Sequence, residues 1–252
     1  MMMSNSKILV TGATGRTGAI VLQKLRQSHD YNCFGFARSP EKVKEIFGTT
    51  EGFYFGDIRD KSTLEPAIKD CETLIIVTSA TPQMKAPPQE GERPEFMYPE
   101  DATPEIIDYE GQVNQIDLAY EAGVKHIILM GSMGGTNKDH PLNKMGNGNI
   151  LIWKRTAEEY LIDSGIDYTI IRAGGLLNEA GGNRKLLVGK DDTLLNRESP
   201  TVPREDVAEV IVKAISIPEA RNKAFDLVSE EASKGEVTEN FAELFSQATA
   251  GL

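Results

Sequence analysis

A glycine-rich turn, Gly12-x-x-Gly15-x-x-Gly18, most constrains how this chain folds. It follows Lys7–Thr11 (KILVT), a short apolar run typical of a buried strand, and precedes a stretch with apolar residues at helical spacing. The first glycine permits a tight turn, and the second lets a pyrophosphate approach the helix N-terminus. The third lets helix and strand pack closely. This order of strand, turn and helix predicts a dinucleotide site.

Strand-like and helix-like segments alternate along the rest of the chain. We therefore expect an α/β fold of Rossmann type, a doubly wound parallel sheet with helices on both faces and small C-terminal elements on the substrate side. The expected strands are 7–11, 32–37, 52–55, 73–78, 126–130, 168–172 and 224–228. The main expected helices are 16–27, 105–122, 150–164, 206–215 and 238–248. We expect a single domain, 1–252, with substrate-side loops at 79–104, 131–149 and 173–203.

The residue at the end of the second strand indicates which dinucleotide is bound. NAD-binding folds usually place Asp or Glu there to accept from the ribose 2′-hydroxyl, whereas this chain has Arg38. A guanidinium matches a 2′-phosphate in charge and in geometry, and Arg16 supplies a second cation. The pattern favours NADP(H) over NAD(H). The residues expected to bind the cofactor from the turn are Gly12, Ala13, Thr14, Gly15, Arg16, Thr17 and Gly18.

Further cofactor contacts are expected where later strands end. Asp57 follows the third strand and is expected to accept from the adenine amino group, while Ile58 packs on the ring. Thr78, Ser79 and Ala80 end the fourth strand, where small side chains allow close approach. Ala173 and Gly174 follow the sixth strand and are expected near the nicotinamide.

Charge and hydropathy exclude other function classes. The formal net charge is −11 without an offsetting basic block, so a nucleic-acid surface is not expected. No apolar stretch has the length of a membrane span, so we expect no membrane insertion. No metal site is expected, and a cytoplasmic location is the default. The expected partner is a small-molecule substrate, with a homodimer left open.

Several motifs together resemble the atypical short-chain dehydrogenase/reductase proteins. They are TGATGRTG, GDI after the third strand, EAGVKHIILMGS and YTIIRAGGLL. The chain looks most like the plant and algal single-domain NADP-binding members, and NmrA-like proteins and flavin/biliverdin reductases are more distant relatives. The resemblance covers nearly the whole chain and implies a Rossmann fold that binds NADP(H).

The resemblance also implies a catalytic set of Ser and Tyr-x-x-x-Lys. Ser132 and Lys154 match the serine and the lysine, but the tyrosine position holds Ile150, which exchanges no proton. Lys154 is expected to hold the nicotinamide ribose and Ser132 to donate to a substrate oxygen. His140 is the candidate histidine for a replacement proton donor.

Two functions fit these residues. The first is an NADPH-dependent oxidoreductase that passes hydride to a small acceptor, such as a conjugated carbonyl, quinone or flavin-like compound, without a tyrosine acid. The second is a non-catalytic NADP(H) sensor or scaffold of NmrA-like type. The proline-rich loop contains Met84, Phe96, Met97 and Tyr98, which suit either a partly apolar lid over a flat substrate or an exposed loop that packs on its own aromatic residues. An S-adenosylmethionine methyltransferase shares the glycine-rich turn but normally has an acid where Arg38 stands.

Overall fold

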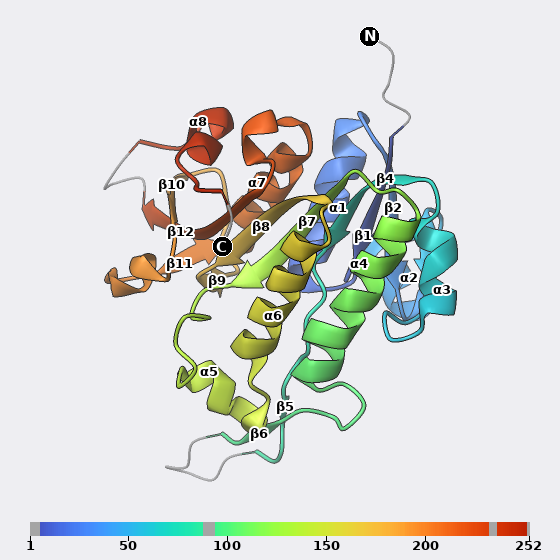
Figure 1. The fold of residues 1–252 in the computed structure, drawn as a ribbon, viewed down its shortest axis with the longest axis horizontal. Helices are drawn as coiled ribbons and strands as arrows, with labels where there is room; N and C mark the ends of the chain where they lie inside the picture. Colours follow the sequence, from blue (N-terminus) through green and yellow to red (C-terminus); the bar gives the residue numbers. More distant parts are fainter. Residues whose placement is uncertain (1–5, 88–93, 232–235, 251–252) are drawn as a thin grey trace.

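One eight-stranded sheet forms the centre of the molecule (Figure 1). The computed structural model describes residues 6–87, 94–231 and 236–250. The strand order is β10-β12-β8-β7-β4-β1-β2-β3. The bounds are β1 Lys7–Thr11, β2 Asn32–Ala37, β3 Phe53–Phe55, β4 Cys71–Ile76, β7 His126–Ser132, β8 Asp167–Ala173, β10 Arg184–Gly189 and β12 Lys223–Glu231. The predicted α/β fold of Rossmann type is confirmed.

Helices cover both faces of the sheet, so the central strands are buried on two sides (Figure 1). In β1, Ile8 and Val10 pack into one core while Leu9 packs into the other, because successive side chains point to opposite faces. The first core includes α1 (Arg16–Ser28), α7 (Arg204–Ser216) and α8 (Phe241–Ser246). The second includes α3 (Lys61–Ile68), α4 (Gly111–Glu121) and α6 (Ile150–Asp163). A further helix, α2 (Pro40–Phe47), follows β2.

The sheet departs from the expected all-parallel arrangement at one edge. β10 pairs antiparallel with β12, and the other pairings in the sheet are parallel. β10 lies in the expected loop 173–203, which also contains β9 (Gly175–Leu177) and β11 (Thr201–Pro203). Those two strands form a separate small sheet. The substrate side is therefore more ordered than the sequence predicted.

The expected loop 79–104 and helix 105–122 also differ from the prediction. The loop contains a short antiparallel pair, β5 (Gln83–Met84) and β6 (Phe96–Met97), while its residues 88–93 lie outside the described residues. The expected helix divides into a π-helix, η1 (Glu105–Glu110), followed by α4. The loop 131–149 contains α5 (Pro141–Lys144) and the 3₁₀ turn η2 (Met145–Asn147).

A buried carboxyl on β12 anchors the loop that follows β7. Asp226 is fully buried, and its Oδ2 accepts a hydrogen bond of 2.8 Å from the Asp192 amide. The Asp192 carboxylate in turn accepts from the amides of Gly134 and Thr136, at 2.7 and 2.8 Å. Because Gly134 and Thr136 follow Ser132, this network fixes the chain on the substrate side of β7.

Asp226 predicts a pH dependence of folding stability. Burial raises the pKa of Asp226 to about 6 from 3.8. A carboxyl whose pKa is raised in the folded state contributes stability below its unfolded pKa and loses that contribution as the pH rises through the folded pKa. Asp226→Asn keeps an acceptor for Asp192 without this loss. We expect its stability relative to the unmodified protein to rise between about pH 4 and pH 7, by up to about 3 kcal/mol.

Urea unfolding followed by circular dichroism at several pH values measures this difference. A stability difference that does not vary with pH contradicts the prediction.

Candidate functional site

The turn after β1 lies so close to β4 that glycine is required. Gly12 has a φ of +71°, and a Cβ there would lie 2.7 Å from the carbonyl oxygen of Val77. A Cβ at Gly18 would overlap the carbonyl oxygen of Gly12. These contacts seat the start of α1 directly at the carboxyl ends of β1 and β4.

The N-terminus of α1 has free hydrogen-bond donors. Gly15 is its N-cap residue, no side chain caps the helix, and the first turn contains no acid. The first amides of a helix have no partner within it, and the helix dipole favours an anion there. Gly15 is exposed and borders both cavities of the site. This arrangement suits a pyrophosphate.

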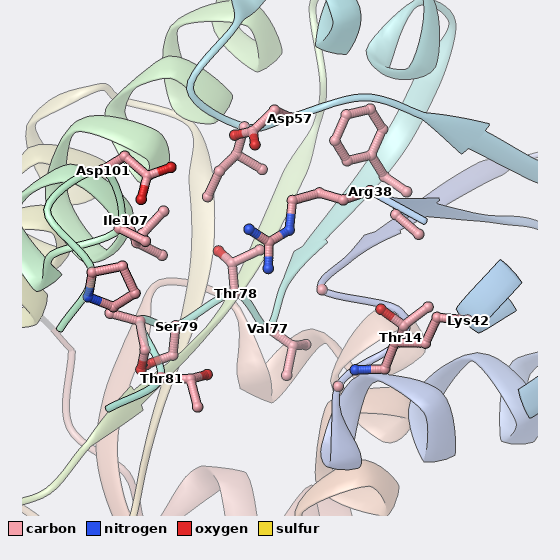
Figure 2. A pocket seen from close by; sticks show the side chains of 18 of the residues that line it. Thr14, Arg38, Lys42, Asp57, Val77, Thr78, Ser79, Thr81, Asp101 and Ile107 are labelled. Carbon is pink, nitrogen blue, oxygen red and sulfur yellow. The ribbon is translucent and has the colours of Figure 1, made fainter. Parts of the chain in front are cut away.

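The first cavity, of about 350 Å³, lies at the ends of β2, β3 and β4. Figure 2 shows the Arg38 guanidinium pointing into it, with Asp57 and Asp101 on the same side. Lys42, on α2, also lines this cavity. Neither Arg38 nor Lys42 forms a salt bridge with any described residue. In a chain of net charge −11, two cations without a salt bridge make this the part of the cleft that suits an anion.

Arg59 joins two carboxylates beside this cavity. It contacts Asp57 through Nε and Nη2, at 2.9 and 2.7 Å, and Asp101 Oδ2 through Nη1, at 3.0 Å. These hydrogen bonds hold the pKa of Asp57 below its usual value. Arg59 therefore balances the negative charge near Arg38, and the expected adenine contact of Asp57 has to share a carboxylate that already accepts from Arg59.

A second cavity, of about 410 Å³, continues from the first toward β7 and β8. Both cavities are bordered by Gly15, Val77, Thr78, Ser79 and Thr81, so they form two parts of one cleft. The second part is lined by Ser132, Ile150, Lys154, Tyr98 and Arg204, among others. It thus joins the glycine-rich turn to the residues that match the family's catalytic positions.

Lys154 forms a buried ion pair that the sequence did not indicate. Its Nζ lies 2.7 Å from Asp108 Oδ1, and the Asp108 side chain is fully buried. Asp108 Oδ2 accepts from the amide of Ala80, at 3.0 Å. Asp108 belongs to η1, and π-helical turns often occur at functional sites. The pair links α6, η1 and the segment after β4 around the second cavity.

The structure brings most of the predicted site residues into the cleft. The first part is lined by Gly12, Thr14, Gly15, Arg38, Asp57, Ile58, Thr78, Ser79 and Ala80. The second is lined by Arg16, Thr17, Gly18, Ser132, Lys154, Ala173 and Gly174.

Two predicted residues lie outside the lining of both cavities. Ala13 is fully buried behind the turn. His140 Nδ1 accepts from the Leu142 amide at 3.2 Å, so its ring caps α5. The structure thus gives His140 a local structural contact and does not bring it to the cleft.

Lys42, Asp108 and Arg204, which lie in the cleft or directly behind it, were not predicted from the sequence. The sequence did contain an indication for Lys42, because it is a second cation four residues after Arg38. Asp108 had none, because it sits among other acids in a segment that looks like an ordinary amphipathic helix. Arg204 donates from Nη1 to the Leu176 carbonyl, at 3.1 Å, and to Asn178 Oδ1, at 2.7 Å, while lining the second cavity.

Within the described residues, no helix is both long and apolar enough to cross a membrane. The same part of the chain contains no group of three or more His, Cys, Asp or Glu side chains arranged to hold a metal ion.

Comparison with known proteins identifies the family. Residues 12–218 match the family described as NAD(P)H-binding. The chain belongs to this family. Its fold and motifs place it among the atypical short-chain dehydrogenase/reductases, whose members bind NAD(P)H.

Two plant relatives match nearly the whole chain. An uncharacterized chloroplastic protein of Arabidopsis thaliana is 54% identical over 96% of this chain and 75% of its own length. Sanguinarine reductase of Eschscholzia californica is 50% identical over 96% of both chains. Among solved structures, a putative NAD-dependent epimerase/dehydratase from Bacillus halodurans has a TM-score of 0.72 at 21% identity, covering 96% of this chain and 100% of its own. That structure supports the fold alone.

The expected cytoplasmic location is wrong, because the relative with 54% identity is a chloroplastic protein. Composition and fold do not encode the compartment in which a protein works, so the default had no physical basis here.

Because the Lys154–Asp108 pair is buried, we expect replacement of Lys154 to destabilise the protein far more than replacement of an exposed lysine. Lys154→Met leaves a buried carboxylate without its cation, so we expect a loss of about 3–5 kcal/mol in unfolding free energy. Asp108→Asn combined with Lys154→Met should recover part of that loss, because the uncompensated charge is gone. Urea titrations of the single and double variants measure both effects.

Lys61 provides the matched control. Its Nζ lies 2.7 Å from Asp117 Oδ2, the same separation, but the Lys61 side chain is 45% exposed. Lys61→Met should lower the free energy of unfolding by less than about 1 kcal/mol. Equal losses for the two lysine variants contradict the interpretation.

Proposed function

We propose that this protein is a reductase that uses NADPH in preference to NADH and transfers hydride to a small conjugated acceptor. The observation that carries the proposal is one cleft that has the Arg38 guanidinium at one end and, at the other, Ser132 and Lys154 beside an apolar wall. The 50% identity to sanguinarine reductase supports reductase chemistry. The loops 79–104, 131–149 and 173–203 are proposed to shape the substrate side.

The cleft residues fit NADPH at three places. The uncapped amides at the start of α1 suit the pyrophosphate, and the glycine backbone leaves room for its approach. The unpaired Arg38 and Lys42 suit a 2′-phosphate, which NADH lacks. Lys154 lines the second cavity, and its ammonium donors suit the nicotinamide ribose, while its charge pairs with Asp108 at 2.7 Å.

Bound NADPH supplies the hydride, and the chain positions the acceptor. Ser132 ends β7, and its hydroxyl donates to the carbonyl of Met133 at 3.1 Å. Rotation about its Cα–Cβ bond turns the hydroxyl toward an acceptor oxygen in the cavity. Leu142, Met145 and Ile150 give this part of the cleft an apolar wall, which suits the flat ring of a conjugated carbonyl, quinone or flavin-like compound.

Steady-state NADPH oxidation tests the proposal. Purified protein is assayed with the neutral acceptors menadione, isatin and riboflavin and with the cationic acceptor N-methylacridinium, and the rate without protein is subtracted. Turnover with at least one of the four supports the reductase. Tight NADPH binding without turnover of any of them favours the NADP(H) sensor instead.

Arg38→Glu tests the cofactor preference. The substitution removes a charge-assisted contact worth about 1.5–3 kcal/mol and places a repelling carboxylate beside the 2′-phosphate. We expect the Kd of NADPH to rise about 100-fold or more and that of NADH to change by less than about threefold. Fluorescence titration with each cofactor measures both constants. Equal loss of both affinities shows that Arg38 does not distinguish the phosphate.

Two lysines on α2 give a matched pair for the same measurement. Lys42→Ala removes a cation from the cavity and should weaken NADPH binding about tenfold. Lys44, two residues later, is exposed and does not line the cavity, so Lys44→Ala should leave both affinities unchanged.

A further inference from the structure

A tyrosine from outside the family's catalytic positions lines the substrate end of the cleft. Tyr98 follows β6 and borders the second cavity together with Ser132, Ile150 and Lys154. Its side chain therefore shares a wall with the isoleucine that occupies the expected tyrosine position. Ile150 offers no proton to an acceptor, whereas a phenol does.

Close packing holds the Tyr98 ring. The residue is only 8% exposed and belongs to the second core. A Cβ at Gly148 would overlap the ring at Cε2, and a Cβ at Gly146 would lie 3.1 Å from Cδ2. Both glycines lie in the segment after α5, so the Tyr98 ring packs one substrate-side loop, 79–104, against the other, 131–149. A ring held in this way has a defined direction.

The Tyr98 hydroxyl makes no hydrogen bond with the described residues. Buried tyrosine hydroxyls usually find a partner, because an unpaired polar group loses its hydration without compensation. The hydroxyl does retain contact with solvent-accessible space, since it is not among the sealed polar atoms of the structure. Water or a ligand in the adjoining cavity therefore supplies the partner.

The surroundings keep Tyr98 protonated. Burial raises the pKa of the Tyr98 hydroxyl, and the nearby Asp108 carboxylate raises it further. The phenol is thus a hydrogen-bond donor at neutral pH. Lys154, whose ammonium lies 2.7 Å from Asp108 Oδ1, lines the same cavity as Tyr98.

We propose that Tyr98 donates the proton when a neutral carbonyl acceptor is reduced in this cleft. The inference rests on the proposed reductase function and identifies its acid. The acceptor carbon receives the hydride electron pair from NADPH and forms a C–H bond, and the C=O π pair moves to oxygen. That oxygen takes the proton from Tyr98 as the phenolic O–H bond breaks, and water reprotonates the phenolate. The ketone becomes an alcohol and NADPH becomes NADP⁺.

A cationic acceptor provides the contrast that isolates this step. N-methylacridinium takes a hydride pair at a ring carbon and becomes a neutral dihydroacridine, so its reduction needs no proton. Isatin is a flat, neutral ketone whose reduction needs both a hydride and a proton. Both acceptors use the same cofactor and the same protein, so a loss of folding or of NADPH binding lowers both rates together.

Tyr98→Phe removes the hydroxyl and keeps the ring. We expect kcat with isatin to fall about 100-fold or more, the contribution of a positioned general acid, and to fall far more than kcat with N-methylacridinium. With the unmodified enzyme, isatin reduction should be slower in D₂O than in H₂O when proton transfer limits the rate. Tyr120→Phe, the same change at a residue that is 67% exposed on α4, should leave both rates unaltered.

The outcomes distinguish failure of the Tyr98 proposal from failure of the reductase proposal. Equal losses with both acceptors, or no loss with isatin, overturn the role of Tyr98 as proton donor. Turnover of N-methylacridinium by the unmodified protein without turnover of isatin also overturns it, while the reductase proposal stands. If the unmodified protein reduces none of the four acceptors, the reductase proposal itself fails, and the acid assigned to it fails with it.

Discussion

The close approach of the β1–α1 turn to β4 determines where the cleft lies. Side chains at Gly12 and Gly18 would meet the Val77 and Gly12 carbonyl oxygens, so a larger residue at either position would push α1 away from the sheet. With glycine at both, the uncapped amides of α1 lie at the junction that the two cavities share. A single backbone constraint therefore aligns the anion site with the carboxyl ends of the strands and joins the two parts of the cleft.

Charge is organised differently at the two ends of that cleft. At the first end, Arg38 and Lys42 are exposed and unpaired within the described residues, so they are free to meet an anion. At the second, the side chains of Lys154 and Asp108 are buried and their opposite charges pair at 2.7 Å. An exposed cation costs little to hold without a partner, whereas a buried one has to be compensated. The exposed end is thus suited to recognition, and the buried end to holding three segments in fixed positions.

The sequence predicted the features that local physics determines. Short β-branched runs, the spacing of Gly12, Gly15 and Gly18, and Arg38 at a strand end each act over a few residues, and the structure places them where they were expected. It could not predict Asp108, because the periodicity of 105–122 looks like one amphipathic helix and does not indicate the π-helical turn that contains this residue. The edge strand β10 was missed for a similar reason, since its partner β12 lies far along the chain.

The position of Tyr98 relates substrate shape to proton supply. A tyrosine at position 150 would belong to α6, whose placement does not depend on the acceptor. Tyr98 instead belongs to the segment after β6, and its ring packs against the glycines after α5; both segments lie on the substrate side. An acceptor that displaces these loops loses the phenol but keeps its access to the hydride. Cationic acceptors tolerate that loss, and the net charge of −11 favours their approach. In the proposed reductase a neutral acceptor has to reach the Tyr98 hydroxyl, so shape selects among neutral compounds more strictly than among cations.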